Sequence, residues 1–387
     1  MIYFDNAATS WPKPAQMPAA MERFLREHGA NPGRSGHSPS INAGRIVFQT
    51  RDRLAKFFGH EDPLSVVFTK NATEALNLAI MGTLGRGDHV ITSAMEHNSV
   101  LRPLRFLEEH GVAVTRVSCG VDGTLDPTDV IKWIRDETKL IVLNHASNVV
   151  GTLFPIGEIG REAAGRDLLF CVDAAQSAGA VSIDMAAMKI DLLAFTGHKA
   201  LYGPQGTGGL CIGSRAKGRL RPLIRGGTGS SSDSDIHPEF LPDCFEAGTL
   251  NAVGLAGLSA GLAFVEEKGI ETVRKHETSL TELLITGLQE IPRVKVYGTL
   301  DATRQVPVVS FNIDGWSCSE AAQALEDRAG VCCRAGLHCA PLAHRQIGTF
   351  PEGTVRFSPG FFNTEEEIET ALAAVRRLAA QPNGGVL

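Results

Sequence analysis

Residues 192–210 read LLAFTGHKALYGPQGTGGL, and this stretch sets the interpretation of the chain. The apolar run Leu192–Phe195 predicts a buried strand, after which Lys199 opens a glycine-rich turn. A lysine just past the carboxyl end of a buried strand is costly to desolvate, so it needs a partner or a task there. One hypothesis is that Lys199 forms a Schiff base with an aldehyde cofactor. The alternative is a surface lysine on a loop, and this stretch alone does not separate the two.

The composition is that of a soluble globular enzyme. The chain has 387 residues, enough for two domains with sizeable cores, and 43% of them are hydrophobic and 21% charged. A net charge of -6 without a lysine- or arginine-rich block argues against nucleic-acid binding. Because no apolar run approaches the roughly 20 residues of a membrane span, we expect no membrane segment.

Cysteine usage and the N-terminus predict a reducing cytoplasm. The opening residues MIYFDNAATS contain an aspartate and no basic region, which is unlike a secretion signal. Eight cysteines are scattered or clustered without the C-x-x-C spacing of a zinc or redox motif. We therefore expect free thiols rather than a disulfide framework.

Residues 65–265 alternate between short apolar runs and helical patterns. Such alternation is typical of an α/β fold, with a mostly parallel sheet flanked by crossover helices. Strands are predicted at 65–68, 89–92, 112–117, 140–143 and 168–172, and helices at 72–81 and 100–110.

The C-terminal third predicts a smaller α+β domain. Ser317 with Glu320, and Thr364 with Glu367, have the spacing of capping boxes that open helices. The long polar segment 225–246 is rich in glycine and serine, and we interpret it as a hinge. The predicted division is a large domain of residues 15–250 and a small domain of residues 1–14 plus 251–387.

Polar residues follow several predicted strands, at the edge where open α/β sheets bind ligands. Residues 69–74 open a helix and could bind an anion or simply cap that helix. Asp173 directly follows a buried strand, so it needs a cation such as a protonated pyridine nitrogen, unless it is a helix N-cap. His97 and residues 144–148 lie near the same edge, where a histidine is either structural or functional.

Together these residues match what pyridoxal 5'-phosphate (PLP) requires: a Schiff-base lysine, an acid for the pyridinium, a histidine for the ring face and an anion site. The main rival is a zinc site, because the chain has 12 histidines. No pair of them has the H-E-x-x-H spacing or a similar one, so no metal site is predicted.

The order of short motifs resembles fold-type I, class V aminotransferases, and most closely the cysteine desulfurases with a short active-site loop. The resemblance covers nearly the full length. The motifs are DNAAT (5–9), NATEAL (71–76), MEHNS (95–99), HASNVVGT (145–152), VDAAQ (172–176), TGHK (196–199), GPQGTGGL (203–210), FEAGTLN (245–251), RAGLHCAP (334–341) and RFSPGFFNT (356–364).

The resemblance implies a fold-type I PLP enzyme and a role for individual residues. Lys199 is implied as the Schiff-base lysine, Asp173 as the partner of the pyridine nitrogen and His97 as the residue stacked on the ring. Asn148 and Gln176 are implied to contact the ring substituents.

Phosphate contacts are implied for Ala72, Thr73, Thr196 and His198. Thr249 is implied to reach the phosphate of a neighbouring subunit, which makes the protein a homodimer.

The resemblance also implies the reaction. Arg356 matches the residue that binds the substrate α-carboxylate, a role suited to a bidentate guanidinium. Cys339 matches the nucleophile that takes sulfur from L-cysteine as a persulfide, leaving L-alanine, after Lys199 removes the Cα proton. Because the nucleophile is a thiolate, His338, Arg334 or another nearby cation is expected to stabilise it. The resemblance further implies a partner protein that accepts the persulfide sulfur, for example in iron–sulfur cluster assembly.

Several positions depart from the family pattern. Leu337 replaces a common histidine, Ala200 is an extra residue in the TGHK turn, and Ala72 lacks a hydroxyl for the phosphate. The alternatives are a selenocysteine lyase acting on L-selenocysteine, and a class V aminotransferase or epimerase without persulfide chemistry. A catalytically inactive scaffold of an iron–sulfur assembly complex is disfavoured because Lys199 and Asp173 are both present. A protein that binds a metal or a cluster directly is disfavoured because the cysteine spacings do not fit. Cys339 favours the desulfurase.

Overall fold

A seven-stranded sheet forms the centre of the computed structural model, which describes residues 1–33 and 35–381. Its strand order is β2-β8-β7-β6-β5-β3-β4, and β8 alone runs antiparallel to its neighbours. The mostly parallel sheet expected from the sequence is therefore confirmed. The strands are β2 (Val66–Thr69), β3 (His89–Ser93), β4 (Ala113–Val117), β5 (Thr138–Asn144), β6 (Leu169–Asp173), β7 (Leu192–Thr196) and β8 (Gly208–Ile212).

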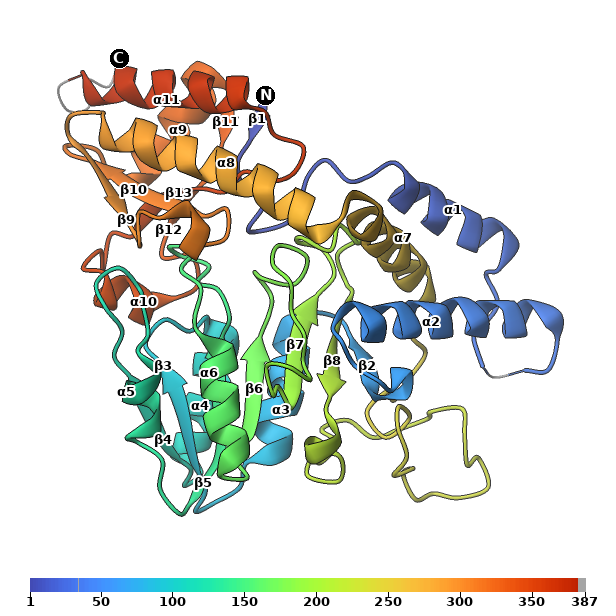
Figure 1. Cartoon of the computed structure of the whole chain (residues 1–387). Helices are drawn as coiled ribbons and strands as arrows, with labels where there is room; N and C mark the ends of the chain where they lie inside the picture. Colours follow the sequence, from blue (N-terminus) through green and yellow to red (C-terminus); the bar gives the residue numbers. More distant parts are fainter. Residues whose placement is uncertain (34, 382–387) are drawn as a thin grey trace.

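Helices cover both faces of this sheet (Figure 1). Successive side chains of a strand point to opposite faces, so Leu193 and Phe195 join one apolar cluster and Leu192 and Ala194 join the other. This arrangement explains why these strands are continuous apolar runs. One face is covered by α3 (Ala72–Thr83) and α4 (Asn98–Glu109), and the other by α2 (Ser38–Phe57), α6 (Ile156–Gly165) and α7 (Ala252–Lys268), with α1 (Gln16–Glu27) and α5 (Pro127–Ile131) at the periphery.

A second apolar core lies beyond the carboxyl ends of the parallel strands (Figure 1). Its antiparallel sheet has the order β12-β13-β10-β9, and β1 pairs with β11 beside it. Both predicted capping boxes are present, at Ser317–Glu320 and Thr364–Glu367. The elements are β1 (Ile2–Tyr3), α8 (Ile270–Gln289), β9 (Val294–Tyr297), β10 (Val309–Ile313), α9 (Cys318–Ala329), β11 (Val331–Cys332), β12 (Arg334–Gly336), α10 (Pro341–Gln346), β13 (Thr354–Phe357) and α11 (Glu365–Ala379). Short 3-10 turns lie at Pro63–Ser65, Ser214–Ala216 and Ala302–Arg304.

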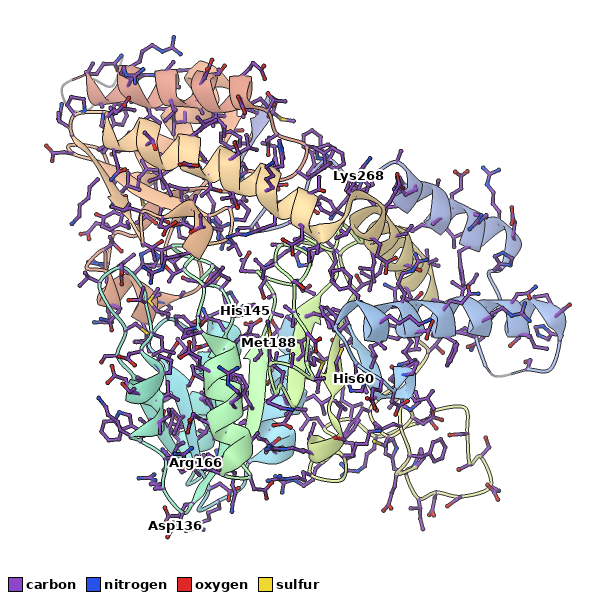
Figure 2. All side chains as sticks on the ribbon, viewed as in Figure 1. His60, Asp136, His145, Arg166, Met188 and Lys268 are labelled. Atoms are coloured by element: carbon purple, nitrogen blue, oxygen red, sulfur yellow. The ribbon has the colours of Figure 1, made fainter. Side chains whose placement is uncertain are left out.

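The chain passes from the first core to the second between α7 and α8. Lys268, labelled in Figure 2, is the last residue of α7, and Gly269 follows it with φ 79°. Segment 225–246 was predicted to be the hinge, but it leaves β8 and returns to α7 in the same core. The prediction was wrong because a polar, glycine-rich composition indicates a loop without saying which elements it joins. The division into residues 15–250 and 1–14 plus 251–387 stays a prediction.

Membrane insertion has no candidate element in the part of the chain that the structure describes. None of the helices within residues 1–33 and 35–381 combines the length and the apolar character that a bilayer span needs.

Candidate active site

A cavity of about 300 Å³ lies at the carboxyl ends of the parallel strands, between the two cores. Figure 2 shows the direction of the parallel strands. Asp136 precedes β5 and His145 follows it, and the two residues lie at opposite ends of the sheet. Every residue predicted from the sequence to form the site lines this cavity, except Cys339 and Thr249. A volume near 300 Å³ is at the lower end of the range for small-molecule and cofactor sites.

Lys199 lies at the cavity wall, where the strand β7 gives way to the glycine-rich turn. The carbonyl of Lys199 accepts hydrogen bonds from the Tyr202 N–H at 2.9 Å and the Ser10 hydroxyl at 2.8 Å, which fix the backbone of the turn. Burial lowers the pKa of Lys199 to about 8, against the opposing effect of the nearby Asp173. The amine is therefore closer to neutrality than an ordinary lysine, as an amine that attacks an aldehyde or accepts a proton must be.

Asp173 ends β6 and is 5% exposed. Its Oδ1 accepts the Ala175 N–H at 2.9 Å, and no ion pair joins its carboxylate to another described residue. Burial raises the pKa of Asp173, and Lys199 acts in the opposite direction. A buried carboxylate without an ion-pair partner suits a ligand that brings a positive charge, such as a protonated pyridine ring.

His97 forms the N-cap of α4 and faces the same cavity. Its Nδ1 accepts the Ser99 N–H at 3.0 Å, which leaves the ring proton on Nε2. Burial, reinforced by Lys199, lowers the pKa of His97 to about 4, so the imidazole is neutral. A neutral, well-fixed ring can stack on a flat cofactor without adding charge.

Glu96, which the sequence reasoning missed, lies beneath His97 and is fully buried. Its carboxyl accepts the Asn144 N–H at 3.0 and 3.1 Å and the Ser93 hydroxyl at 2.6 Å. Burial raises the pKa of Glu96 to about 8. These contacts tie the turn that carries His97 to the end of β5. The sequence signal that could have identified Glu96 was the presence of a glutamate just after the end of a predicted strand.

The N-terminus of α3 provides the anion-binding end of the cavity. Ala72 and Thr73 are its first residues, and the first N–H groups of a helix have no partner within it. The Thr73 and Ser99 hydroxyls lie 2.8 Å apart. His198 lines the same cavity, and its Nδ1 is buried without a partner among the described residues. Together with Thr196, this set fits a phosphate.

Arg356 on β13 is 1% exposed and reaches the cavity from the second core. Its Nη2 donates to Oδ1 of Asp5 at 2.8 Å and its Nη1 to the Asn148 carbonyl at 2.9 Å. Its Nε and the side-chain oxygen of Asn148 are buried without a partner among the described residues. These free polar atoms could receive a small polar substrate. Gln176, whose Nε2 donates to the Ala7 carbonyl at 3.1 Å, lines the cavity nearby.

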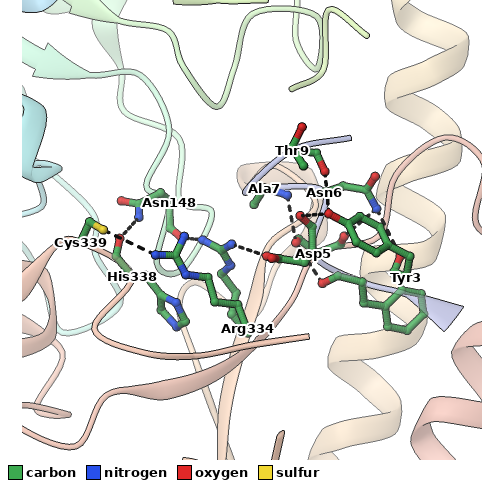
Figure 3. Close-up of polar contacts among 12 residues, drawn as sticks. Tyr3, Asp5, Asn6, Ala7, Thr9, Asn148, Arg334, His338 and Cys339 are labelled. Carbon is green, nitrogen blue, oxygen red and sulfur yellow. Dashed lines mark hydrogen bonds and ion pairs between the residues drawn. The ribbon is translucent and has the colours of Figure 1, made fainter. Parts of the chain in front are cut away.

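Cys339 directly follows His338, which lines the cavity, and the two residues form a turn. Figure 3 labels both of them. Both His338 and Cys339 have positive φ, 46° and 60°, a conformation that costs of order 1–3 kcal/mol in non-glycine residues. The Asn98 N–H donates to the Cys339 carbonyl at 2.8 Å, and Asn148 Nδ2 to the His338 carbonyl at 2.6 Å. The thiol is exposed. These bonds hold the turn so that the sulfur stays accessible.

Of the two residues expected to stabilise the Cys339 thiolate, only Arg334 contacts the sulfur. Its Nη2 donates to Sγ at 3.5 Å (Figure 3). The His338 ring instead points to Thr354, with Nε2 at 3.1 Å from its carbonyl. Burial lowers the pKa of His338 well below its usual value, so this ring supplies no positive charge.

Thr249 lies apart from the cavity of its own chain. It is exposed and lines a separate hollow of about 290 Å³ beside α2. A larger hollow of about 860 Å³ follows residues 218–244, but it contains none of the predicted site residues.

The family model for class V aminotransferases matches residues 2–371. The chain belongs to this family. A probable cysteine desulfurase from Methanothermobacter thermautotrophicus is 36% identical over 95% of this chain and 92% of that protein. Cysteine desulfurase IscS from Vibrio atlanticus is 33% identical over 97% and 92%. Within the class V aminotransferases, the chain therefore groups with the cysteine desulfurases.

Solved structures agree with this class V assignment. The apo structure of cysteine desulfurase from Thermococcus onnurineus NA1 is 35% identical, covers 98% of this chain and 94% of that chain, and has a TM-score of 0.92. Class V aminotransferases use PLP, so this chain is a PLP-dependent enzyme. The cavity fits that cofactor through the unpaired Asp173, the near-neutral Lys199 and the helix N-terminus at Ala72.

Proposed function

We propose that the chain is a cysteine desulfurase that converts L-cysteine to L-alanine and keeps the sulfur as a persulfide on Cys339. The observation that carries this proposal is the placement of an exposed thiol, hydrogen bonded to Arg334, beside the cavity that contains Lys199 and Asp173. An aminotransferase needs the lysine and the aspartate but has no use for a thiol held on a strained turn.

The cofactor would be held by residues at or after the carboxyl ends of β3, β6 and β7. Lys199 Nζ would form its covalent bond, Asp173 would accept the pyridine N–H, and His97 would stack on the ring. Bound PLP supplies an electron sink that stabilises the negative charge left when an α proton is removed. Asp173 strengthens that sink by keeping the ring nitrogen protonated. The phosphate would lie at Ala72, Thr73, Thr196 and His198, and Gln176 would contact a ring substituent.

The substrate would be oriented by Arg356 and Asn148. The guanidinium of Arg356 is already fixed by Asp5 and by the Asn148 carbonyl, so little side-chain entropy is lost when it receives a carboxylate. Lys199 Nζ lines the same cavity as Arg356, and its lowered pKa of about 8 would allow it to accept the Cα proton of the substrate.

Sulfur transfer would take place at Cys339. The thiolate Sγ attacks the sulfur of the substrate, and a new S–S bond forms. The Cβ–S bond of the substrate breaks, and its electron pair stays on Cβ, which takes a proton to give the methyl group of alanine. Arg334 would stabilise the thiolate before the attack.

Three further features are part of the proposal. The protein would act as a homodimer in which Thr249 reaches the cofactor phosphate of the neighbouring subunit. The persulfide would pass to a sulfur-acceptor protein, and the compartment would be the cytoplasm. The exposed position of Thr249, outside its own cavity, supports the first of these.

The test is to give the purified holoenzyme L-cysteine and a reductant and to measure sulfide and alanine in equal amounts. Lys199→Ala should abolish both products. Cys339→Ser should abolish sulfide release while the lysine-bound cofactor remains visible by its absorbance. Full turnover in Cys339→Ser would exclude the persulfide mechanism. Much faster release of selenide from L-selenocysteine would assign the chain as a selenocysteine lyase.

A further inference from the structure

Thr249 is exposed, yet the chain on either side of it is firmly held. Three residues earlier, Glu246 is 9% exposed and inserts its side chain between α2 and β2. Two residues later, Asn251 caps α7 by accepting the Gly254 N–H at 3.0 Å. Asn251 also donates to the carbonyl of Gly206 at 3.1 Å, in the glycine-rich turn that follows Lys199. A short exposed stretch between two anchors is a means of presenting one side chain.

The Glu246 anchor is a buried, fully hydrogen-bonded ion pair. Arg51 on α2 donates to both carboxylate oxygens, at 2.7 and 2.8 Å, and the Phe68 N–H donates to Oε1 at 2.6 Å. Arg51 also donates to the carbonyl of Val66, and its guanidinium lies 4.4 Å from the centre of the Phe68 ring. The pair thus joins the end of the polar segment to β2, the strand that leads into α3.

Such a pair is a poor means of stabilising the fold alone. The desolvation of two buried charges offsets most of their attraction, and apolar replacements often serve stability as well. A bidentate pair does fix position, because the guanidinium and carboxylate planes must align. Hydrogen bonds within segment 225–246 also hold its end, for example between His237 Nε2 and the Cys244 carbonyl at 3.0 Å, whereas the ion pair ties that end to α2 and β2.

We propose that Arg51 and Glu246 are positioning residues that hold Thr249 against the cofactor phosphate of a second copy of this chain. This inference rests on the proposed function, since it assumes a bound PLP and a dimer. A single hydroxyl contributes to phosphate binding only if it is held close to its ideal position, and the ion pair provides that support. The ion pair of one subunit therefore acts on the cofactor that is bound in the other subunit.

The first experiment measures cofactor release from the holoenzyme, which does not depend on desulfurase turnover. Glu246→Gln keeps the shape of the side chain but removes its charge. We expect this variant to release PLP roughly tenfold faster or more, because the hydrogen bond from Thr249 to the charged phosphate would be lost. The matched control is Glu266→Gln on α7, which breaks an exposed ion pair with Arg53. Arg53 lies on α2, as Arg51 does, and its Nε is 3.4 Å from the Glu266 carboxylate. The control should release PLP at the wild-type rate.

The second experiment separates positioning from stability by using mixed dimers. A Lys199→Ala subunit has no cofactor lysine but an intact Thr249 segment. When it pairs with a Glu246→Gln subunit, the one lysine-bound cofactor should leave at the wild-type rate, because the intact segment comes from the other subunit. If the mixed dimer released it as fast as the Glu246→Gln homodimer does, the pair would act within its own subunit. That result, or a monomeric holoenzyme, overturns the proposal.

Misfolding of Glu246→Gln is controlled by a double variant. Arg51→Met combined with Glu246→Leu removes both charges together and leaves none unpaired. We expect it to fold, to keep the unfolding temperature of the apoprotein and still to release PLP faster, with rescue in the mixed dimer. Wild-type release from a folded double variant would also overturn the proposal.

Discussion

Nη2 of Arg356 lies 2.8 Å from Oδ1 of Asp5, although the two residues are 351 positions apart in the sequence. The contact forms because the chain beside β1 runs parallel to the chain that follows β13, where Asp5 forms a bridge with Ser358. The N-terminus therefore contributes directly to the wall of the candidate substrate site. Asp5 orients the guanidinium of Arg356 and balances its buried charge.

Replacing Asp5 by alanine should weaken substrate binding. Arg356 would lose the acceptor that fixes Nη2, and a hydrogen bond between charged groups contributes about 1.5–3 kcal/mol. We expect KM for L-cysteine to rise about tenfold or more, with a smaller change in kcat, measured as alanine formed. Asp5→Asn keeps an acceptor oxygen, so its KM should lie between those of the wild type and Asp5→Ala. Asp314→Ala, at an exposed ion pair with Arg293, is the control and should leave KM unchanged. An unchanged KM in Asp5→Ala would show that Arg356 needs no such support.

The reactivity of Lys199 should depend on pH in a defined direction. Its pKa is lowered to about 8, so the neutral, nucleophilic amine becomes the main form as the pH rises through 8. The rate at which the apoprotein recombines with PLP should rise over the same range. Asp173 favours the charged amine, so Asp173→Asn should move the midpoint of this profile to lower pH. A midpoint near 10 in the wild type would contradict the burial of the amine.

The general fold and the position of the site could be predicted from local sequence patterns. Apolar runs define strands such as β7, and a parallel sheet places the residues after its strands at one edge, so Lys199, Asp173 and His97 converge without further information. Capping boxes could be predicted because both partners lie three residues apart.

Long-range pairs could not be predicted in the same way. Arg51 lies in a helical stretch full of charged residues and resembles a solvent-facing side chain, yet it pairs with Glu246, 195 positions later. Asp5 lies in a run of small residues that fits an ordinary turn. The partner of a buried charge depends on which segments the folded chain brings together, and neither periodicity nor composition records that. The direction of the His338 ring, away from Cys339, depended on the same tertiary packing.

Glu96 should make the stability of the apoprotein depend on pH. Burial raises its pKa from 4.5 in the unfolded chain to about 8 in the folded protein. Between these values the folded state holds a proton that the unfolded state has lost, so the contribution of Glu96 falls as the pH rises through this window. The slope is at most about 1.4 kcal/mol per pH unit. Glu96→Gln cannot ionise and should flatten the pH dependence of the free energy of unfolding, measured with denaturant at pH 5.5 and 8. Equal slopes in both proteins would show that Glu96 is ionised in the fold.

Arg334 should control the reactivity of Cys339. Its guanidinium is the one positively charged group with a hydrogen bond to this sulfur among the described residues, at 3.5 Å, and it favours the thiolate that alkylating reagents attack. Arg334→Met should slow the reaction of Cys339 with iodoacetamide at pH 7, by roughly the tenfold that loss of a charge-assisted hydrogen bond produces. His338→Gln, which removes a neutral ring directed at Thr354, is the comparison and should have a smaller effect. Mass spectrometry of the labelled peptide provides an internal reference, because burial raises the pKa of Cys333 to about 12 and this thiol should stay unlabelled. If His338→Gln slowed the reaction more than Arg334→Met, the imidazole rather than the guanidinium would be the group that prepares Cys339 for attack.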